Sequence, residues 1–207
     1  DIRKDTLNMN EELLENLITD KTKAIVPVHY AGVSCNMNKI NSLAKKYNLL
    51  VIEDAAQAIL SEYNNKTLGS IGDIGCFSFH ATKNIVSGEG GAITINNSQL
   101  IERAEIIWEK GTNRSKFLKG QIDKYTWVDI GSSFLPNELT AAFLQAQLNE
   151  SENIIKKRLD IWNYYHKNFH DLEELGLLRR PIIPKDCRHN GHMYYLLLRD
   201  STIRDKF

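Results

Sequence analysis

Two short apolar runs separated by one amphipathic helix constrain the fold of this chain most strongly. The runs are AIVPVHY at residues 24–30 and LLVIEDA at residues 49–55, and each has the length of a buried strand. Between them, four residues recur at the spacing of a single helical face: Ile40, Leu43, Ala44 and Tyr47. A strand, a helix and a strand in this order predict a parallel βαβ unit and therefore an α/β fold. Pro27 argues against a central place in the sheet for the whole first run.

Two more predicted strands follow a turn-rich segment at residues 64–73. Residues 75–80, GCFSFH, form the third strand, and residues 92–96, AITIN, form the fourth. No helical period lies between them, and the GEGG run at residues 88–91 bends the chain. A tight reversal there makes the fourth strand antiparallel to the third, because a parallel pair needs a long crossover. The sequence thus predicts a mainly parallel sheet with one antiparallel strand.

Apolar periodicity predicts four further helices, at residues 11–18, 100–108, 139–146 and 154–169. Residues 111–136 form a long polar and aromatic loop without a period, and such a loop is usually functional. The last of these helices leads away from the sheet, so we place a domain boundary near residue 150. Residues 1–150 are then part of a large α/β domain. Residues 151–207 start a small α+β domain that ends in a strand at MYYLLLRD.

The composition excludes several classes of partner. The 207 residues are 42% hydrophobic, which is enough for a real core, and the 26 basic residues cancel the 26 acidic ones. Zero net charge leaves no electrostatic footprint for nucleic acid or an anionic membrane surface. No apolar run is long enough to cross a bilayer. The three cysteines lack CxxC spacing, which favours free thiols in a reducing cytoplasm over disulfides or a zinc site.

Both ends of the sequence read as cut ends. DIRKDTLNMN leads straight to a predicted helix, and STIRDKF reads as the start of a helix that is then lost. Residues 1–12 are polar and charged, so no signal peptide is visible. We therefore expect this sequence to be the middle section of a longer cytoplasmic protein.

Four polar residues fall at or just beyond the carboxyl ends of predicted strands: Asp54, Gln57, Ser78 and Lys83. Open α/β sheets bind ligands at this edge. Asp54 follows an apolar run, so its carboxylate must be paired or neutralised. A protonated pyridine nitrogen is a suitable partner, and the pair would keep such a ring cationic. A helix-capping or ion-paired aspartate is the structural alternative.

Lys83 lies in a turn beyond a buried strand. A neutral amine in a partly dry site can form a Schiff base and later carry a proton as a general base. The alternative is an ordinary solvated lysine, because lysine side chains are mostly exposed.

The other two residues offer weaker signals. The hydroxyl of Ser78 is a candidate phosphate contact, and the amide of Gln57 can bond a ring hydroxyl. A strand serine bonded to backbone and a helix-capping amide are the alternatives.

GEGG lacks the spacing of a P-loop or a GxGxxG fingerprint, so we interpret it as a tight turn. His29 is interpreted as a satisfied core histidine.

Four phrases resemble, in order and with consistent spacing, the DegT/DnrJ/EryC1/StrS family of sugar aminotransferases, which depend on pyridoxal phosphate (PLP). The phrases are TKAIVPVHYAG, LLVIEDAAQA, GSIGDIGCFSFHATKN and GEGGAITINN, and the resemblance extends from Asp1 to about Trp162. It implies the aspartate-aminotransferase type of fold (fold type I) and PLP as the cofactor. It also implies a homodimer whose active sites borrow residues from the partner.

The resemblance implies roles for single residues. Lys83 falls on the family's aldimine lysine and Asp54 on the acid that bonds the pyridine nitrogen. Gln57 falls on the amide beside the ring hydroxyl and Ser78 on a phosphate-contacting serine. The implied reaction moves the amino group of L-glutamate, through PLP at Lys83, to a 4-keto-6-deoxy nucleotide sugar. A dTDP-linked sugar is the expected acceptor.

Two features depart from the family's pattern. Ser133 stands where many members have an asparagine that reaches the partner's phosphate. The serine-glycine-threonine loop that binds the cofactor phosphate would precede Asp1.

Within the loop at residues 111–136, Arg114 and Lys116 are available for a phosphate of the sugar nucleotide.

Three alternative functions stay open. A PLP-dependent sugar dehydratase of the same family would carry histidine at the position of Lys83, which weakens that alternative. A receiver-like regulatory module also sets an acid and a lysine at strand ends, but EDAAQ lacks the paired acids of such modules. A truncated, catalytically incomplete dimerisation module is the third.

Overall fold

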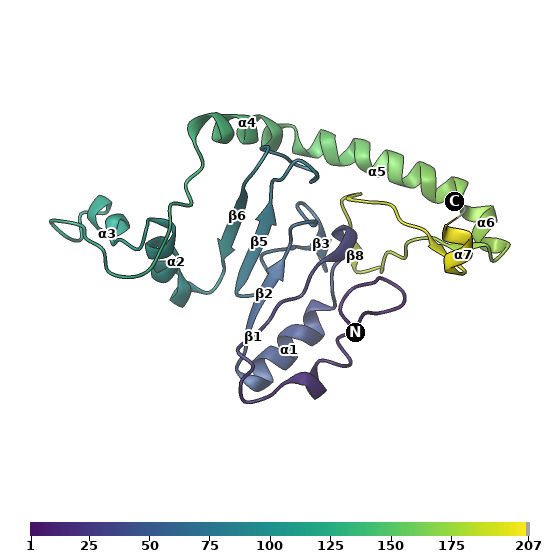
Figure 1. Ribbon diagram of the computed structural model, residues 1–207, viewed down its shortest axis with the longest axis horizontal. Coiled ribbons are helices and arrows are strands. Elements are labelled where there is room, and N and C mark those ends of the chain that lie inside the picture. The colour runs from purple at the N-terminus through teal and green to yellow at the C-terminus, as the bar shows by residue number, and fades with distance from the viewer. Residues whose placement is uncertain (206–207) are drawn as a thin grey trace.

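A four-stranded sheet organises the chain, of which the computed structural model describes residues 1–205. The strand order is β1-β2-β5-β6 (Figure 1). β1 (Ala24–Ile25) and β5 (Ile74–Ser78) lie on either side of β2 (Leu50–Asp54) and run parallel to it. β6 (Gly91–Ile95) pairs with β5 in the antiparallel sense. The predicted mainly parallel sheet with one antiparallel strand is confirmed.

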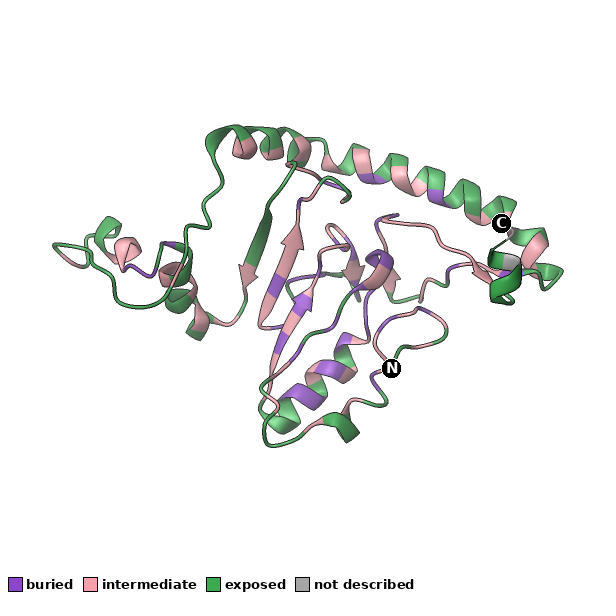
Figure 2. Cartoon of the chain, in the orientation of Figure 1, coloured by how far each residue is buried: buried purple, intermediate pink, exposed green. Residues whose placement is uncertain are grey.

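α1 (Met37–Tyr47) is the crossover helix between β1 and β2. Asn36 begins it, because its side-chain oxygen accepts the N–H of Lys39 at 3.1 Å. Asn48 ends it in the left-handed conformation, with φ of 51°. Its core-facing residues are buried: Met37, Ile40, Leu43 and Ala44. Figure 2 shows that buried residues gather on α1 and β2.

Pro27 limits β1 to two residues. Proline has no N–H to donate to a neighbouring strand. The regular pairing of β1 therefore ends at Ile25, and an isolated bridge between Val28 and Asp54 continues it. The carbonyl of Pro27 still accepts the N–H of Asp54 at 2.9 Å.

A second, smaller sheet joins segments that are far apart in the sequence. β3 (Glu62–Tyr63) pairs in the antiparallel sense with both β4 (Lys66–Thr67) and β8 (Cys187–Arg188). No sequence pattern predicted this contact between the region after β2 and the C-terminal part of the chain. It brings the C-terminal segment close to the carboxyl edge of the main sheet.

The second half of the chain is mainly helical. Its elements are η3 (Ser98–Leu100), α2 (Ile101–Trp108), α3 (Arg114–Leu118), α4 (Glu138–Asn149), α5 (Ser151–Asn168), α6 (His170–Glu174), β7 (Leu178–Arg179), β9 (Leu197–Leu198) and α7 (Ser201–Arg204). Figure 1 shows α4 and α5 following each other along one side of the molecule. The helices predicted at residues 100–108, 139–146 and 154–169 are confirmed. A division into two domains near residue 150 stays a prediction. Within residues 1–205, no helix combines the length and apolar character needed to cross a membrane.

The helix predicted at residues 11–18 is wrong. Only a 3-10 turn, η1 (Glu15–Leu17), forms there. Leu14 packs against the core, but Leu17 is 67% exposed and Leu13 is 40% exposed, so much of the predicted apolar face covers no surface. Burial of such a face supplies most of the stability of a short helix. The predicted final strand is also shorter than expected, since only the two residues of β9 pair.

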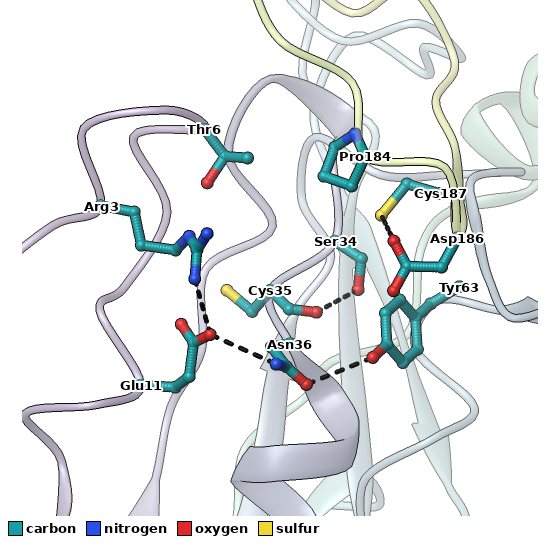
Figure 3. A pocket seen from close by; sticks show the side chains of 10 residues that line it. All are labelled: Arg3, Thr6, Glu11, Ser34, Cys35, Asn36, Tyr63, Pro184, Asp186 and Cys187. Atoms are coloured by element: carbon teal, nitrogen blue, oxygen red, sulfur yellow. Dashed lines mark hydrogen bonds and ion pairs between the residues drawn. The ribbon is translucent and has the colours of Figure 1, made fainter.

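Polar contacts hold the N-terminal segment in place of that helix. Arg3 Nη1 and Asn36 Nδ2 donate to Glu11 Oε1 at 2.8 and 3.3 Å. These residues line a cavity of about 220 Å³ that Cys187 of β8 also borders (Figure 3). None of the four strand-end residues predicted to carry chemistry lines this cavity.

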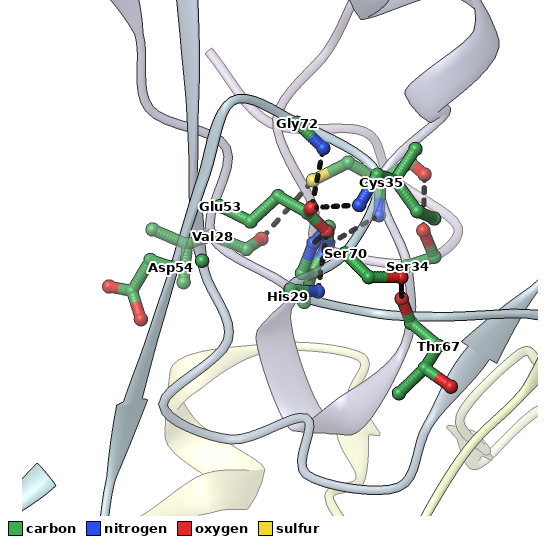
Figure 4. A network of polar contacts seen from close by, with 12 residues as sticks. Val28, His29, Ser34, Cys35, Glu53, Asp54, Thr67, Ser70 and Gly72 are labelled. Carbon is green, nitrogen blue, oxygen red and sulfur yellow. Dashed lines mark hydrogen bonds and ion pairs between the residues drawn. The ribbon is translucent and has the colours of Figure 1, made fainter. Parts of the chain in front are cut away.

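A buried carboxylate ties together the loops around the end of β2 (Figure 4). Glu53 Oε2 lies 3.0 Å from His29 Nε2 and accepts the N–H of Gly69 at 2.8 Å. Glu53 Oε1 accepts the N–H groups of Ile71 and Gly72, each at 2.6 Å. We call these five residues the Glu53 network. It connects the end of β1 to β2 and to the loop that leads into β5.

The side chains of His29 and Glu53 are fully buried. His29 Nδ1 accepts the N–H of Cys35 at 3.2 Å, so the ring hydrogen is on Nε2 and is donated to Glu53. The prediction of a satisfied core histidine at this position is confirmed.

Hydrogen bonds keep Glu53 ionised in spite of its burial. Burial alone raises the pKa of Glu53, but hydrogen bonds from His29, Gly72 and Gly69 outweigh it, and the pKa is held below the ordinary value of 4.5. A carboxyl group with a lowered pKa in the folded state stabilises the fold fully above its unfolded pKa. That stabilisation is lost as the pH falls through the folded pKa.

Replacing Glu53 by glutamine should therefore remove a pH-dependent part of the stability. At pH 7 we expect a loss of about 3 kcal/mol, because the new amide group faces backbone donors. Below about pH 4.5 the wild type should lose stability more steeply than the variant, which has no proton to take up there. Urea unfolding of the complete gene product between pH 3 and 7 measures both effects. If the free energy of unfolding fell equally steeply with pH in the two proteins, the lowered pKa assigned to Glu53 would be contradicted.

Candidate active site

Glu53 and Asp54, the last two residues of β2, point to opposite faces of the sheet, because side chains alternate along a strand. Glu53 points into its network, and the carboxylate of Asp54 points away from it (Figure 4). Asp54 is half-buried, and its Oδ1 accepts the N–H of Ala56 at 3.0 Å. Asp54 forms no ion pair with any residue between 1 and 205. It presents a charged group at the sheet edge with only a local turn contact.

Gln57 ties the turn after β2 to the turn after β1. Its Oε1 accepts the N–H of Ala31 at 2.7 Å. Ala31 lies within η2 (Tyr30–Gly32) and has φ of 57°, a conformation that this hydrogen bond helps to hold. The amide oxygen of Gln57 is therefore occupied, and its Nε2 is the atom available to a ligand.

Ser78 lies on the same face of the sheet as Asp54. The register pairs Asp54 with Cys76, and Ser78 is two residues further along β5. Burial, and then the charge of Asp54, raise the pKa of the Cys76 thiol, which agrees with this closeness. The hydroxyl of Ser78 accepts one long hydrogen bond, at 3.4 Å from the N–H of His80.

Lys83 lies in the reversal between β5 and β6. Its N–H donates to the carbonyl of His80 at 2.9 Å, and the N–H of Ala81 donates to Gly88 at 3.1 Å. The lysine side chain is half-buried. Among the residues that the structure describes, none forms an ion pair with its ammonium group. The four strand-end residues are thus brought to one edge of the sheet, as the sequence predicted.

Residues from the C-terminal segment complete this edge, and sequence reasoning missed them. Asn190 is fully buried, and its Nδ2 donates to the carbonyls of Gln57 and Ile59, each at 2.9 Å. The carbonyl of Asn190 accepts Asn84 Nδ2 at 2.9 Å. His192 Nδ1 lies 2.8 Å from Asn84 Oδ1. No periodic signal marks these residues, because an Asn-Gly pair predicts only a turn.

Comparison with known proteins identifies the family of this chain. The model of the DegT/DnrJ/EryC1/StrS aminotransferase family matches residues 1–207, so the chain belongs to this family. MJ1066 of Methanocaldococcus jannaschii is 41% identical over 207 residues, which are 99% of this chain and 53% of that protein. GDP-perosamine synthase of Caulobacter vibrioides is 35% identical over 204 residues, 97% of this chain and 52% of that protein. The family resemblance drawn from the four phrases is confirmed.

Solved structures extend the agreement to the fold. Spr1654 of Streptococcus pneumoniae, solved in its PLP form, matches with a TM-score of 0.80 and 26% identity. The match covers 96% of this chain and 54% of that one. The chain spans about half the length of the curated relatives that it matches. The aminotransferase type of fold is confirmed for this half.

The residues at the sheet edge fit PLP. The cofactor needs an anion at its ring nitrogen, a donor at its ring hydroxyl and an amine at its aldehyde. Asp54, Gln57 Nε2 and Lys83 are groups of these kinds, and Ser78 adds a hydroxyl for the phosphate. Asp54 and Lys83 carry opposite charges at one edge, and neither is paired within residues 1–205. The roles of the single residues stay predictions.

Substituting Asp54 by asparagine should leave the fold almost unchanged. Its carboxylate makes one local hydrogen bond, which an asparagine oxygen can also accept. We expect the free energy of unfolding to stay within about 1 kcal/mol of the wild type. Urea unfolding at pH 7 checks this, with Glu53→Gln as the matched neighbour. A loss as large as that of Glu53→Gln would show that Asp54 is a structural residue.

Proposed function

We propose that the complete protein is a PLP-dependent aminotransferase that moves the amino group of L-glutamate to a 4-keto-6-deoxy nucleotide sugar. One observation supports this most. At a single sheet edge, Asp54 and Lys83 present opposite charges that no residue between 1 and 205 neutralises. The family supports the reaction class. Relatives named as a GDP-perosamine synthase and as transaminases of UDP- and dTDP-linked amino sugars support the substrate class.

The residues at the sheet edge divide the work in this proposal. When bound, PLP supplies a cationic ring that accepts the electrons of the bond broken at the amino-bearing carbon. Asp54 keeps a proton on the pyridine nitrogen, and Gln57 donates Nε2–H to the ring hydroxyl. Ser78 donates its hydroxyl to the phosphate. Lys83 would hold the cofactor covalently through Nζ. Once the substrate amine had displaced it, its free amine would move a proton between the amino-bearing carbon of the substrate and the former aldehyde carbon of the cofactor.

A dTDP-linked acceptor is the finer part of the proposal. Residues 110–135, KGTNRSKFLKGQIDKYTWVDIGSSFL, resemble the transaminase that makes dTDP-4-amino-4,6-dideoxygalactose in enterobacterial common antigen synthesis. This stretch is our candidate for contact with the sugar nucleotide.

Two cations of this stretch are less available than the sequence suggested. Arg114 Nη1 pairs with Glu109 Oε1 at 2.9 Å, and Lys116 Nζ pairs with Glu102 Oε1 at 2.5 Å. Each must exchange a carboxylate for a phosphate in order to contact the nucleotide. The exchange is feasible for Lys116, because its pair with Glu102 lies at the surface, where ion pairs contribute little stability. It costs more for Arg114, because Glu109 is buried and would be left with a weaker partner.

We also propose that the complete protein is a homodimer. Five large apolar side chains between residues 127 and 143 are more than half exposed: Trp127, Ile130, Phe134, Leu139 and Phe143. We call them the apolar patch. Large exposed apolar side chains that gather in one segment are typical of a protein contact, and the family resemblance implies a partner that contributes to the site.

A charge placed in the apolar patch should break this contact. Leu139→Glu, at a side chain that is 85% exposed, should shift the mass in solution from dimer to monomer, because it buries an unpaired charge in the interface. Leu175→Glu, at 71% exposure outside the patch, is the matched control. Light scattering after size-exclusion chromatography measures the mass. An unchanged mass for Leu139→Glu would place the contact elsewhere.

Removing the amine of Lys83 should abolish amino transfer. We expect Lys83→Ala to lower the rate by about a thousandfold or more, because both covalent attachment and proton transfer depend on Nζ. Mass spectrometry of nucleotide sugars incubated with ¹⁵N-labelled glutamate measures the transfer. Lys45→Ala, at an exposed lysine of α1, is the control and should behave as the wild type.

The same assay separates the alternatives. Transfer at the wild-type rate by Lys83→Ala would overturn the role of the lysine. A wild type that binds PLP but only removes water from the sugar would favour the dehydratase, although that class carries histidine at this position. A complete gene product that binds no PLP would favour a catalytically incomplete dimerisation module.

A further inference from the structure

His192 lies beside the turn that carries Lys83 and has no part in the reaction proposed above. Its Nδ1 is 2.8 Å from Asn84 Oδ1. Asn84 Nδ2 already donates to the carbonyl of Asn190, so Oδ1 is the atom that faces the histidine, and it can only accept. His192 Nδ1 therefore carries a hydrogen, and Nε2 is the nitrogen with a lone pair.

The surroundings keep the ring neutral. Burial, together with the positive charges of Lys83 and Arg158, lowers the pKa of His192 to about 4. At pH 7 the ring thus donates from Nδ1 without adding a second positive charge next to Lys83.

The backbone of His192 is anchored on both sides. Its N–H donates to Asn190 Oδ1 at 3.0 Å, and its carbonyl accepts Arg158 Nη2 at 3.2 Å. The side chain of Asn190 is hydrogen-bonded to the carbonyl of Gln57 in the turn after β2, and Arg158 belongs to α5. Asn84 is itself buried, with 5% of its surface exposed. The contact between His192 and Asn84 therefore joins a fixed point on the C-terminal segment to the residue that follows Lys83.

We propose that His192 is a positioning residue for Lys83: its Nδ1–H holds Asn84 Oδ1 and so fixes the turn from which the lysine projects. The consequence for the cofactor rests on the proposed role of Lys83. A reacting amine works only when it is held within about 0.5 Å of its productive position, and buried hydrogen bonds supply such constraint.

Two amide substitutions at position 192 distinguish the role of Nδ1 from that of Nε2. Asparagine at position 192 places an NH₂ group near the position of Nδ1, and glutamine places one near Nε2. His192→Asn should therefore keep the bond to Asn84, whereas His192→Gln and His192→Ala should lose it. In the complete gene product we expect the PLP dissociation constant to rise about tenfold in the Gln and Ala variants and to stay within about twofold of the wild type in the Asn variant. Titration followed by the absorption of bound PLP measures it.

Amide hydrogen exchange without PLP tests the positioning independently of the cofactor. The N–H groups of Ala81 and Lys83 are bonded within the turn. They should exchange about tenfold faster in the Gln and Ala variants and at the wild-type rate in the Asn variant. Asn84→Ser removes the acceptor from the other side and also the bond from Asn84 Nδ2 to the carbonyl of Asn190, so exchange in this variant should be at least as fast as in His192→Gln. His189→Asn is the control, because the ring of His189 packs against Trp162, with centroids 4.5 Å apart.

Three outcomes would overturn the proposal. The first is unchanged exchange in all variants at position 192. The second is rescue by glutamine and not by asparagine, which would assign the role to Nε2. The third is faster exchange across the whole sheet, which would make His192 a general stabilising residue. A wild type that binds no PLP would instead contradict the proposed function, and the exchange measurement would still decide the positioning.

Discussion

A carboxylate without access to water must be surrounded by donors, and the donors around Glu53 determine where the strand ends lie. His29 supplies one of them from the end of β1, and the loop at residues 69–72 supplies three from the approach to β5. Leaving any of these groups unpaired would cost several kcal/mol. The network therefore fixes three segments relative to one another beneath the edge where the candidate site lies.

Structural and chemical duties are separated along the chain at this edge. Glu53 has a full set of partners, whereas Asp54, the next residue, has one local hydrogen bond and faces the other side. Asn190 is fully bonded, whereas the Lys83 ammonium has no anionic partner within residues 1–205. The buried groups whose hydrogen bonds are all made hold the turns in place. The groups that still lack an ionic partner are those that suit a cofactor. This pattern would be unusual in a merely structural sheet edge.

Sequence reasoning found the elements whose patterns are local. Short apolar runs predicted the sheet, and the absence of a helical period between the third and fourth runs predicted its antiparallel strand. The helix expected at residues 11–18 failed, because a periodic pattern shows which face would be buried and not whether a surface exists to cover the whole of that face. Asn190 and His192 were missed, because their contacts with Ile59 and Asn84 span 131 and 108 residues and leave no periodic trace. Long-range polar contacts of this kind carry no signal in a single sequence.

The chemistry proposed here depends on Lys83 as the covalent partner of PLP. The most direct measurement is borohydride reduction of the complete gene product after incubation with PLP, followed by peptide mapping by mass spectrometry. Reduction converts the link between lysine and cofactor into a stable adduct. The proposal predicts one adduct, on the peptide that contains Lys83. An adduct on a different lysine, or none in a protein that is folded, would contradict it.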